Sequence, residues 1–263
     1  EIVDEVRTAH ELGITSVHLH ARDPATGDPT WDPAVYAEII EGIRAFAPEL
    51  VVCVSLSGRD WAAIDKRTAV LELRDERKPD MGSLTLSSMN FSDEASVNEP
   101  ATVEALAEAM QSVGVVPELE VFGLGMVNYA NYLVERDVLE PPHYCNLLLG
   151  NVATAQADLL HVGTMLRDLP EDTVWALGGI GDDQIRMNSL AVALGGGVRV
   201  GIEDNIYFDA GREIPATNEA LLQRIHELVA LHDRSVMTPD SFRDRLSLQP
   251  GHGVYGRESD QGR

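Results

Sequence analysis

The amino-acid sequence predicts an α/β protein, a (β/α)8 TIM barrel, from three observations. Short apolar runs typical of buried strands alternate along the chain with longer segments of helical periodicity. Seven predicted strands alternate with eight predicted helices, and the first of these elements is a helix. The length of 263 residues matches the ~250 residues that such a barrel needs. Because the pattern starts on a helix, we expect a first strand to precede residue 1 and to complete the count of eight.

The first half of the chain shows this alternation clearly. In residues 1–13 apolar side chains recur at helical spacing, and a glycine ends the predicted helix. The strand expected at 14–21 leads to a helix over 32–48, with Asp32 as its N-cap and Pro33 at its first position. Periodicity and turn residues then predict a strand at 50–57, a helix at 60–74, a strand at 80–88 and a helix at 100–114.

The second half repeats the pattern. Strands are predicted at 116–123, 144–150, 173–181 and 197–204, and helices at 126–139, 153–170, 182–196 and 217–233. An open doubly wound sheet is the alternative architecture, but no G-x-G-x-x-G loop follows the first strands. We therefore expect a single TIM-barrel domain over residues 1–248, lacking its first strand, and a Gly-rich polar tail over 249–263.

The charge of the chain disfavours polyanionic partners. The formal net charge is -23, and Lys66 and Lys78 are the only lysines. Nucleic acid and anionic membrane surfaces are therefore not expected to bind, and small molecules are the expected partners. A carboxylate-rich surface with few lysines suits a salt-rich cytoplasm, which we state as a hypothesis; a genome biased toward arginine codons is the alternative.

The remaining composition points to a cytoplasmic protein. No apolar run approaches the ~20 residues that a membrane-spanning helix needs, and no signal-peptide pattern opens the sequence. Cys53 and Cys145 are the only cysteines, and both lie in apolar strand-like runs. Buried free thiols, not a disulfide, are expected for them.

Two histidines, His18 and His20, stand two residues apart in the strand at 14–21. Strand periodicity points both side chains to the same face, and catalytic residues of a TIM barrel lie at the C-terminal ends of its strands. A catalytic zinc takes three nitrogen or carboxylate ligands and keeps one open position. Glu203 follows the last strand, which closes the barrel beside the first ones, so we predict a metal site of His18, His20 and Glu203. The alternative is a pair of core histidines.

The stretch RVGIEDN, residues 199–205, offers a second catalytic group. While Glu203 binds a metal, Asp204 can serve as general base. Arg199 can orient Asp204 and keep it ionised, because a nearby opposite charge favours the charged form. The alternative is a structural ion pair.

Two further strand ends, SLSGR at 55–59 and TLSSMN at 85–90, are candidates for substrate binding. Ser57 and Gly58 offer a hydroxyl and an unobstructed backbone N–H to a carboxylate or oxyanion, and Arg59 could clamp a carboxylate. Thr85 and Ser87 offer hydroxyls in the same way. A helix cap and a plain turn are the alternatives.

Together these motifs resemble the β-keto acid cleavage enzyme family. The HxHxRDP and RVGxEDN pair is specific, and all the motifs occur in the family's order up to about residue 248. They read VHLHARDPATGDPTWD, VSLSG, LTLSSMNF, PELEVFG, GNVATAQADLLHV, WALGGIG, GGGVRVGIEDNIY and NEALLQRIHEL.

The resemblance implies a zinc-dependent transferase on a (β/α)8 barrel, a homotetramer with a role in amino acid catabolism. Its reaction converts a β-keto acid and acetyl-CoA, as co-substrate, into acetoacetate and a new acyl-CoA by a retro-Claisen type C–C cleavage. The implied metal ligands are His18, His20 and Glu203, the implied acid/base pair is Asp204 and Arg199, and the implied substrate-binding residues are Ser57, Gly58, Thr85 and Ser87.

One departure and two rival functions stay open at this point. Arg59 stands where the family more often has threonine and glycine, so an anionic substrate tail is possible. A metal-dependent hydrolase of the HxH barrel type is the main rival, although it usually needs further histidines on the middle strands. A non-catalytic barrel that binds a CoA ester is the second rival.

Overall fold

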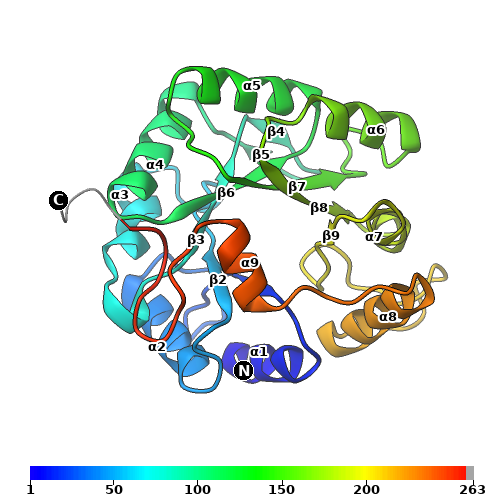
Figure 1. The fold of residues 1–263 in the computed structure, drawn as a ribbon, viewed down its shortest axis with the longest axis horizontal. Helices are drawn as coiled ribbons and strands as arrows, with labels where there is room; N and C mark the ends of the chain where they lie inside the picture. Colours follow the sequence, from blue (N-terminus) through cyan, green and yellow to red (C-terminus); the bar gives the residue numbers. More distant parts are fainter. Residues whose placement is uncertain (259–263) are drawn as a thin grey trace.

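A computed structural model describes residues 1–258 as an α/β fold in which seven parallel strands curl into an open barrel (Figure 1). Within these residues the strands neighbour one another in the order β1-β2-β3-β6-β7-β8-β9, so β1 and β9 form the two edges. The predicted parallel, curled sheet is confirmed, and closure by an eighth strand stays a prediction. The bounds are β1 Ser16–Leu19, β2 Val51–Val54, β3 Met81–Thr85, β6 Val116–Val121, β7 His143–Leu149, β8 Thr173–Gly179 and β9 Gly197–Val198; a small antiparallel pair adds β4 Met89–Asn90 and β5 Ala95–Ser96.

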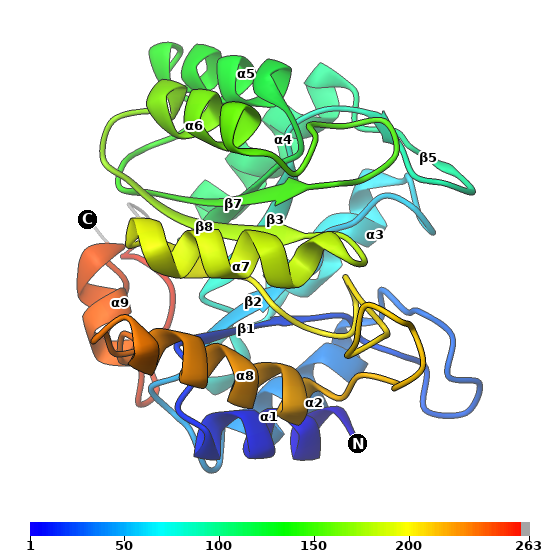
Figure 2. The ribbon, with the colours of Figure 1, turned by 90° about the vertical axis from the view of Figure 1, so that its right-hand side faces the viewer.

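The helices form a layer around the convex face of the sheet (Figures 1 and 2). Asp32 caps α2 by accepting a hydrogen bond from the Ala34 N–H, with Pro33 next in the chain, as predicted. Within residues 1–258 no helix is both long and apolar enough to cross a bilayer. The bounds are α1 Ile2–Glu11, α2 Pro33–Arg44, α4 Pro100–Ser112, α5 Leu124–Glu135, α6 Leu159–Asp168, α7 Asp183–Leu194 and α8 Asn218–Leu231.

Three predicted elements were clearly wrong in extent. One is the helix expected at 153–170, which begins only at Leu159. The helix expected at 60–74 is a short helix, α3 Ile64–Thr68, followed by 3-10 turns η1 Ala69–Glu72 and η2 Asp75–Arg77. Arg67 is buried in this stretch and donates to the Leu56 carbonyl and to Asn98, so contacts outside the stretch help to fix its conformation. The strand expected at 197–204 ends at Val198, because the chain then turns, with Asp204 N–H donating to the Gly201 carbonyl.

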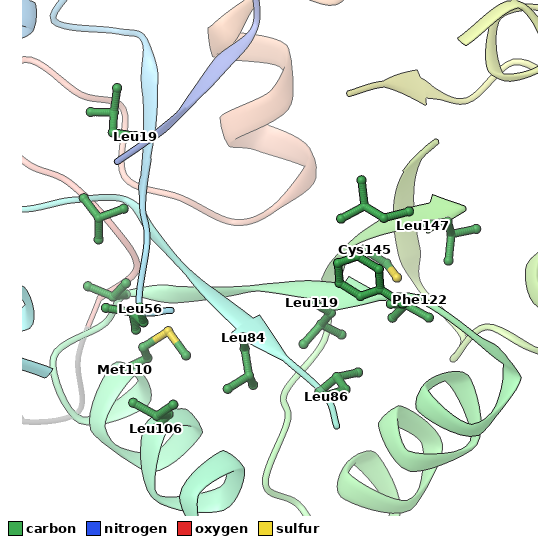
Figure 3. Packing of buried hydrophobic residues seen from close by; sticks show 14 of the residues in the cluster. Leu19, Leu56, Leu84, Leu86, Leu106, Met110, Leu119, Phe122, Cys145 and Leu147 are labelled. Carbon is green, nitrogen blue, oxygen red and sulfur yellow. The ribbon is translucent and has the colours of Figure 1, made fainter. Parts of the chain in front are cut away.

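Strand alternation separates the core into two layers. In β2, Val52 and Val54 face the helices and join the main core, whereas Val51 and Cys53 face the interior of the curled sheet. The main core lies between sheet and helices, where Leu84, Leu119 and Met110 meet (Figure 3). A smaller interior cluster includes Phe242 and Leu246, at the end of α9 Pro239–Arg245, a helix that the sequence did not predict.

A buried ion cluster fastens α9 to the N-terminal end of the sheet, where this helix crosses the opening (Figure 2). Asp80, which directly precedes β3, is fully buried and accepts hydrogen bonds from Arg243 at 2.8 and 2.9 Å and from Arg44 at 2.6 Å. The backbone N–H groups of Val52 and Gly256 donate to it at 3.0 Å. Burial alone would raise the pKa of Asp80, but the charges of Arg44 and Arg243 outweigh it and lower the pKa below the ordinary value.

Part of the predicted C-terminal tail joins this cluster. Besides the Gly256 contact, the Tyr255 ring lies under the Arg44 guanidinium, 3.7 Å from the ring centroid. Residues 259–263 of the predicted tail lie outside the described residues. The division into a domain over 1–248 and a tail over 249–263 stays a prediction.

We predict that Asp80→Asn destabilises the protein by ~3–5 kcal/mol at neutral pH, because it leaves two buried guanidinium groups without their counter-charge. A carboxylate with a lowered folded-state pKa stabilises the fold fully above its unfolded pKa of ~3.9, and that contribution is lost as the pH falls through the folded-state pKa. The difference between variant and wild type should therefore shrink below about pH 4. Urea unfolding followed by circular dichroism across pH measures it.

The control is Glu41→Gln, which breaks the exposed pair with Arg77 and should cost less than ~1 kcal/mol. A loss for Asp80→Asn no larger than that of the control would contradict the prediction.

Candidate metal and catalytic site

Polar side chains from five neighbouring strands meet inside the curled sheet. Residues paired in register on parallel strands point to the same face, and His18 of β1 pairs with the interior-facing Cys53 of β2. In the same way Thr85 of β3 pairs with Glu120 of β6, and Glu118 of β6 with Tyr144 of β7. The fold therefore positions imidazole, thiol, hydroxyl and carboxylate groups around one space.

The three predicted metal ligands lie together. One ligating atom each from His18, His20 and Glu203 lies within 4.8 Å of the other two. His20 Nε2 is 2.9 Å from Glu203 Oε1, yet this buried nitrogen makes no hydrogen bond of acceptable geometry among the described residues. The Glu203 side chain is 41% exposed, so the group opens toward solvent.

Arg199 is the central cation of the site. Its nearly buried guanidinium lies 3.2 Å from Asp204 Oδ2, 3.2 Å from Glu203 Oε2, 3.3 Å from Glu120 Oε1 and 4.0 Å from Glu118 Oε2. Asp204, the predicted base, is thus in direct contact with Arg199, its predicted partner. One guanidinium organises four carboxylates that come from two parts of the chain.

Burial and charge shift the pKa values of this cluster in opposite directions. Burial and the neighbouring Glu203 raise the pKa of Asp204, in spite of the opposing charge of Arg199. For Glu203, burial would raise the pKa too, but Arg199 and the two imidazoles lower it well below its ordinary value. Adjacent carboxylates with separated pKa values are suited to separate roles, one as a permanent anion and one as a proton carrier.

The charge of the cluster fits a divalent cation. Four carboxylates against one guanidinium leave an excess of negative charge in a partly buried space, and such an excess is costly unless it is compensated. Two imidazoles and a carboxylate within 4.8 Å are donors that zinc accepts. The unsatisfied nitrogen of His20 is a further sign that this group fits a metal ion.

A second set of ligand atoms overlaps the first. His18, Cys53 and Glu118 also lie within 4.8 Å of one another. Burial and the adjacent Glu118 raise the pKa of the Cys53 thiol well above its ordinary value. Burial would lower the pKa of His18, but the charge of Glu118 raises it to about 9. We favour the group of His18, His20 and Glu203, because the buried Nε2 of His20 has no hydrogen-bond partner among the described residues.

The predicted substrate-binding residues divide into two groups. Thr85 joins the cluster, because its hydroxyl donates to Glu120 Oε2 at 2.7 Å and Glu120 contacts Arg199. Ser87 lies half-buried in the loop after β3, with its hydroxyl directed to the Ser88 carbonyl. These hydroxyls thus lie at and just after the C-terminal end of β3, the strand that neighbours β6 with its two glutamates.

The loop after β2 carries the other predicted substrate-binding residues, Ser57, Gly58 and Arg59. Within residues 1–258, no hydrogen bond or ion pair joins them to the predicted metal ligands. The Ser57 hydroxyl accepts from the Arg59 N–H at 3.3 Å. The Arg59 guanidinium lies 4.8 Å from the Phe91 ring centroid and 3.9 Å from Glu94. Behind the loop, a Cβ on Gly58 would approach Arg67 Nη1 to 2.8 Å, so only glycine fits there without displacing that buried guanidinium.

Sequence reasoning missed the roles of Glu118 and Glu120 in holding the cluster. The signal was present in PELE, because two glutamates two residues apart in a buried strand must face the same interior. His143 lies at the first residue of β7, the opposite end from the site. Within residues 1–258 the only groups of potential ligand atoms include no histidine besides His18 and His20, which gives no support to the HxH hydrolase alternative.

A cleft of about 1200 Å³ opens beside the metal ligands and runs between β1 and β9. Its lining includes His20, Glu203, Val17, Val198 and Phe242.

Comparisons with known proteins identify relatives of this chain. The family model for "beta-keto acid cleavage enzyme" matches residues 1–248. The 3-keto-5-aminohexanoate cleavage enzyme of Fusobacterium nucleatum is 34% identical over 251 residues, 95% of this chain and 89% of that protein. The 3-oxoadipate:acetyl-CoA acetyltransferase of Cupriavidus necator is 35% identical over 262 residues, 98% of this chain and 89% of that protein.

Among solved structures, the binary complex of ObcA with oxaloacetate matches with a TM-score of 0.82 at 20% identity. The match covers 96% of this chain and 66% of that chain. At this identity the likeness shows a shared fold.

We predict that His20→Ala and Glu203→Gln each weaken Zn²⁺ binding by about tenfold or more, because each removes one of three protein ligands. Competition with a chromophoric chelator measures the affinity. The control is His161→Ala, since His161 lies on α6 near Asp158 and away from the cluster.

Substitution of the metal by Co²⁺ shows which of the two ligand sets binds it. The favoured set has no sulfur, so no thiolate-to-cobalt absorption is expected. A near-ultraviolet charge-transfer band that disappears in Cys53→Ser would instead assign the metal to His18, Cys53 and Glu118.

Proposed function

The chain belongs to the beta-keto acid cleavage enzyme family, and from that premise we propose that it is a zinc-dependent enzyme that converts a β-keto acid and acetyl-CoA into acetoacetate and a new acyl-CoA. Acetyl-CoA-dependent cleavage of a β-keto acid is the activity of an enzyme of this kind. The observation that carries the proposal is the grouping of His18, His20 and Glu203 next to the Arg199–Asp204 pair.

The proposed reaction balances without an oxidant or reductant. The bond between C2 and C3 of the β-keto acid breaks, and the acyl group that contains C3 passes to the sulfur of CoA. The carbon C2, with its carboxylate, becomes bonded to the carbonyl carbon of the acetyl group, which gives acetoacetate. Charge develops on carbonyl oxygens along this path, so the site must stabilise oxyanions.

Each group of the cluster has a task in this proposal. A zinc ion held by His18, His20 and Glu203 would supply a Lewis acid for the keto oxygen. Asp204 accepts and returns the proton of the carbon between the two carbonyl groups, and burial strengthens it as a base by raising its pKa. Arg199 keeps the Asp204 carboxylate in place through the 3.2 Å contact.

The loops after β2 and β3 are proposed to hold the substrate. Ser57, Gly58, Thr85 and Ser87 would bind the carboxylate end of the keto acid. We propose that Arg59 binds an anionic tail, because its guanidinium, which also lies over the Phe91 ring, has only a 3.9 Å ionic contact with one exposed glutamate and can exchange it for a substrate carboxylate. The name of the Cupriavidus necator relative contains 3-oxoadipate, a keto acid with such a tail.

The finer features of the fold belong to the same proposal. A further strand between β9 and β1 would close an eight-stranded barrel; the two unpaired edges and the cleft between them, lined by Val17 and Val198, support it. A homotetramer, a cytoplasmic location and a role in amino acid catabolism stay predictions.

We predict that the purified protein forms acetoacetate and a new acyl-CoA from acetyl-CoA and at least one member of a panel of β-keto acids with neutral, cationic and anionic tails. Mass spectrometry of both products provides the measurement. Asp204→Asn should lower kcat by ~10²–10⁴-fold, because it removes the proton carrier. The control Asp182→Asn changes only an exposed pair with Arg212.

Two outcomes would count against this proposal. If the protein consumes acetyl-CoA with none of the keto acids, it does not catalyse the proposed reaction. If Asp204→Asn forms acetoacetate at an unchanged rate, Asp204 is not the proton carrier. Product release without CoA would favour the metal-dependent hydrolase.

We predict that Arg59→Ala raises KM for keto acids with an anionic tail by ~10–100-fold, because one charge-assisted contact is lost. KM for keto acids with a neutral tail should stay unchanged. Steady-state kinetics on matched substrates measures this difference. Arg77→Ala, at an exposed site on the outer layer, serves as the control. An equal effect on both substrate classes would contradict a role for Arg59 in recognising the tail.

A further inference from the structure

The structure assigns to Glu118 a role as a positioning residue that sets the tautomer of His18 and so presents its Nε2 to the metal. This inference rests on the metal site of the proposed function. It concerns a residue that is not itself one of the three favoured ligands. The evidence is a closed set of hydrogen bonds around a buried carboxylate.

Both oxygens of Glu118 are occupied inside the sheet. Oε2 lies 2.5 Å from His18 Nδ1 and accepts from the Cys53 thiol at 3.3 Å. Oε1 accepts from Asn146 Nδ2 at 2.6 Å. The Glu118 side chain is only 4% exposed, so water cannot replace these partners easily. The carboxylate therefore sits in a frame of donors that come from β1, β2 and β7.

The hydrogen bond to Glu118 determines which ring nitrogen of His18 carries the proton. An ionised carboxylate only accepts hydrogen bonds, so the 2.5 Å contact requires a proton on Nδ1. A neutral imidazole with its proton on Nδ1 carries its lone pair on Nε2. Among the described residues, Nδ1 is the only ring nitrogen of His18 with a hydrogen-bond partner. Glu118 thus leaves Nε2 free as a ligand, in the manner of a carboxylate–histidine–metal triad.

Asn146 makes the orientation of a replacement side chain predictable. The Tyr144 hydroxyl donates to Asn146 Oδ1 at 3.3 Å, which keeps the Asn146 amide nitrogen directed at Glu118. Glu118→Gln offers one oxygen to three donors, His18 and the Cys53 thiol on one side and Asn146 on the other. If the Gln oxygen turns to Asn146, its amide nitrogen donates to His18 Nδ1, and the imidazole proton must move to Nε2.

A second substitution reverses that preference without changing the total charge. In Glu118→Gln with Asn146→Asp, the aspartate accepts from the Gln amide nitrogen, so the Gln oxygen returns to His18 Nδ1. The matched control is Glu120→Gln, which removes a carboxylate two residues along β6 that bonds Thr85 and Arg199 but not His18.

The first measurement is the affinity for Zn²⁺ by chelator competition. Glu118→Gln should weaken binding by ~10–100-fold, as expected for loss of an outer partner of a ligating histidine, and the double variant should recover most of the loss. Circular dichroism and thermal unfolding verify that each variant is folded. A loss in Glu118→Gln that the folded double variant does not recover would overturn the assignment.

The second measurement needs neither metal nor activity. Nitrogen-15 NMR of the histidine side chains, on metal-free protein at a pH where His18 is neutral, reports which ring nitrogen carries the proton. We expect Nδ1–H in wild type, Glu120→Gln and the double variant, and Nε2–H in Glu118→Gln. Retention of Nδ1–H with unchanged Zn²⁺ affinity in Glu118→Gln would overturn the role of Glu118.

The two proposals fail in different ways. If wild-type protein does not bind Zn²⁺, the proposed function is lost, and the NMR signal of His18 still decides whether Glu118 sets its tautomer. If wild type binds Zn²⁺ and forms acetoacetate but Glu118→Gln changes neither affinity nor tautomer, only the role of Glu118 is lost.

Discussion

The guanidinium of Arg199 is the interaction on which the candidate site depends. It is nearly buried and lies within 4.0 Å of four carboxylates. Without it these acids would repel one another in a space of low dielectric constant, and burial would favour their neutral forms. Its position follows from the tight approach of β9 to β8, where Gly196 lies so close to the Trp175 ring that a Cβ would be 1.9 Å from it. The chain turns directly after Arg199, which brings Glu203 and Asp204 back over the same interior.

Signals that are local in the sequence predicted the most. Alternating apolar runs indicated a parallel α/β sheet, and the spacing of His18 and His20 indicated a shared face, because both depend only on the period of the backbone. The pairing of His18 with Glu118 was not predictable in this way, since it depends on the register of strands that are 100 residues apart. The short α3 and the unpredicted α9 depend likewise on distant partners, which fix buried arginines within them.

Two buried ion clusters at opposite ends of the sheet differ in how their charge is balanced. At the N-terminal end, Asp80 has two arginines and two backbone donors, all supplied by the chain itself. At the C-terminal end, Arg199 faces more acids than it can neutralise, and His20 keeps a buried nitrogen without a hydrogen bond. The first arrangement is complete and serves stability. The second carries an excess of negative charge, which is typical of a cation-binding site.

The Asp80 cluster limits how far the protein can fold during translation. Its partners Arg243 and Gly256 lie 163 and 176 residues further along the chain, so they leave the ribosome long after Asp80 does. A nascent chain therefore has Asp80 and Arg44 without their remaining partners until that segment has been synthesised. Chains that stop before α9 leave this end of the sheet uncovered, with the apolar partners of Phe242 and Leu246 exposed. The interior of the sheet can therefore be covered at this end only after α9 has been synthesised.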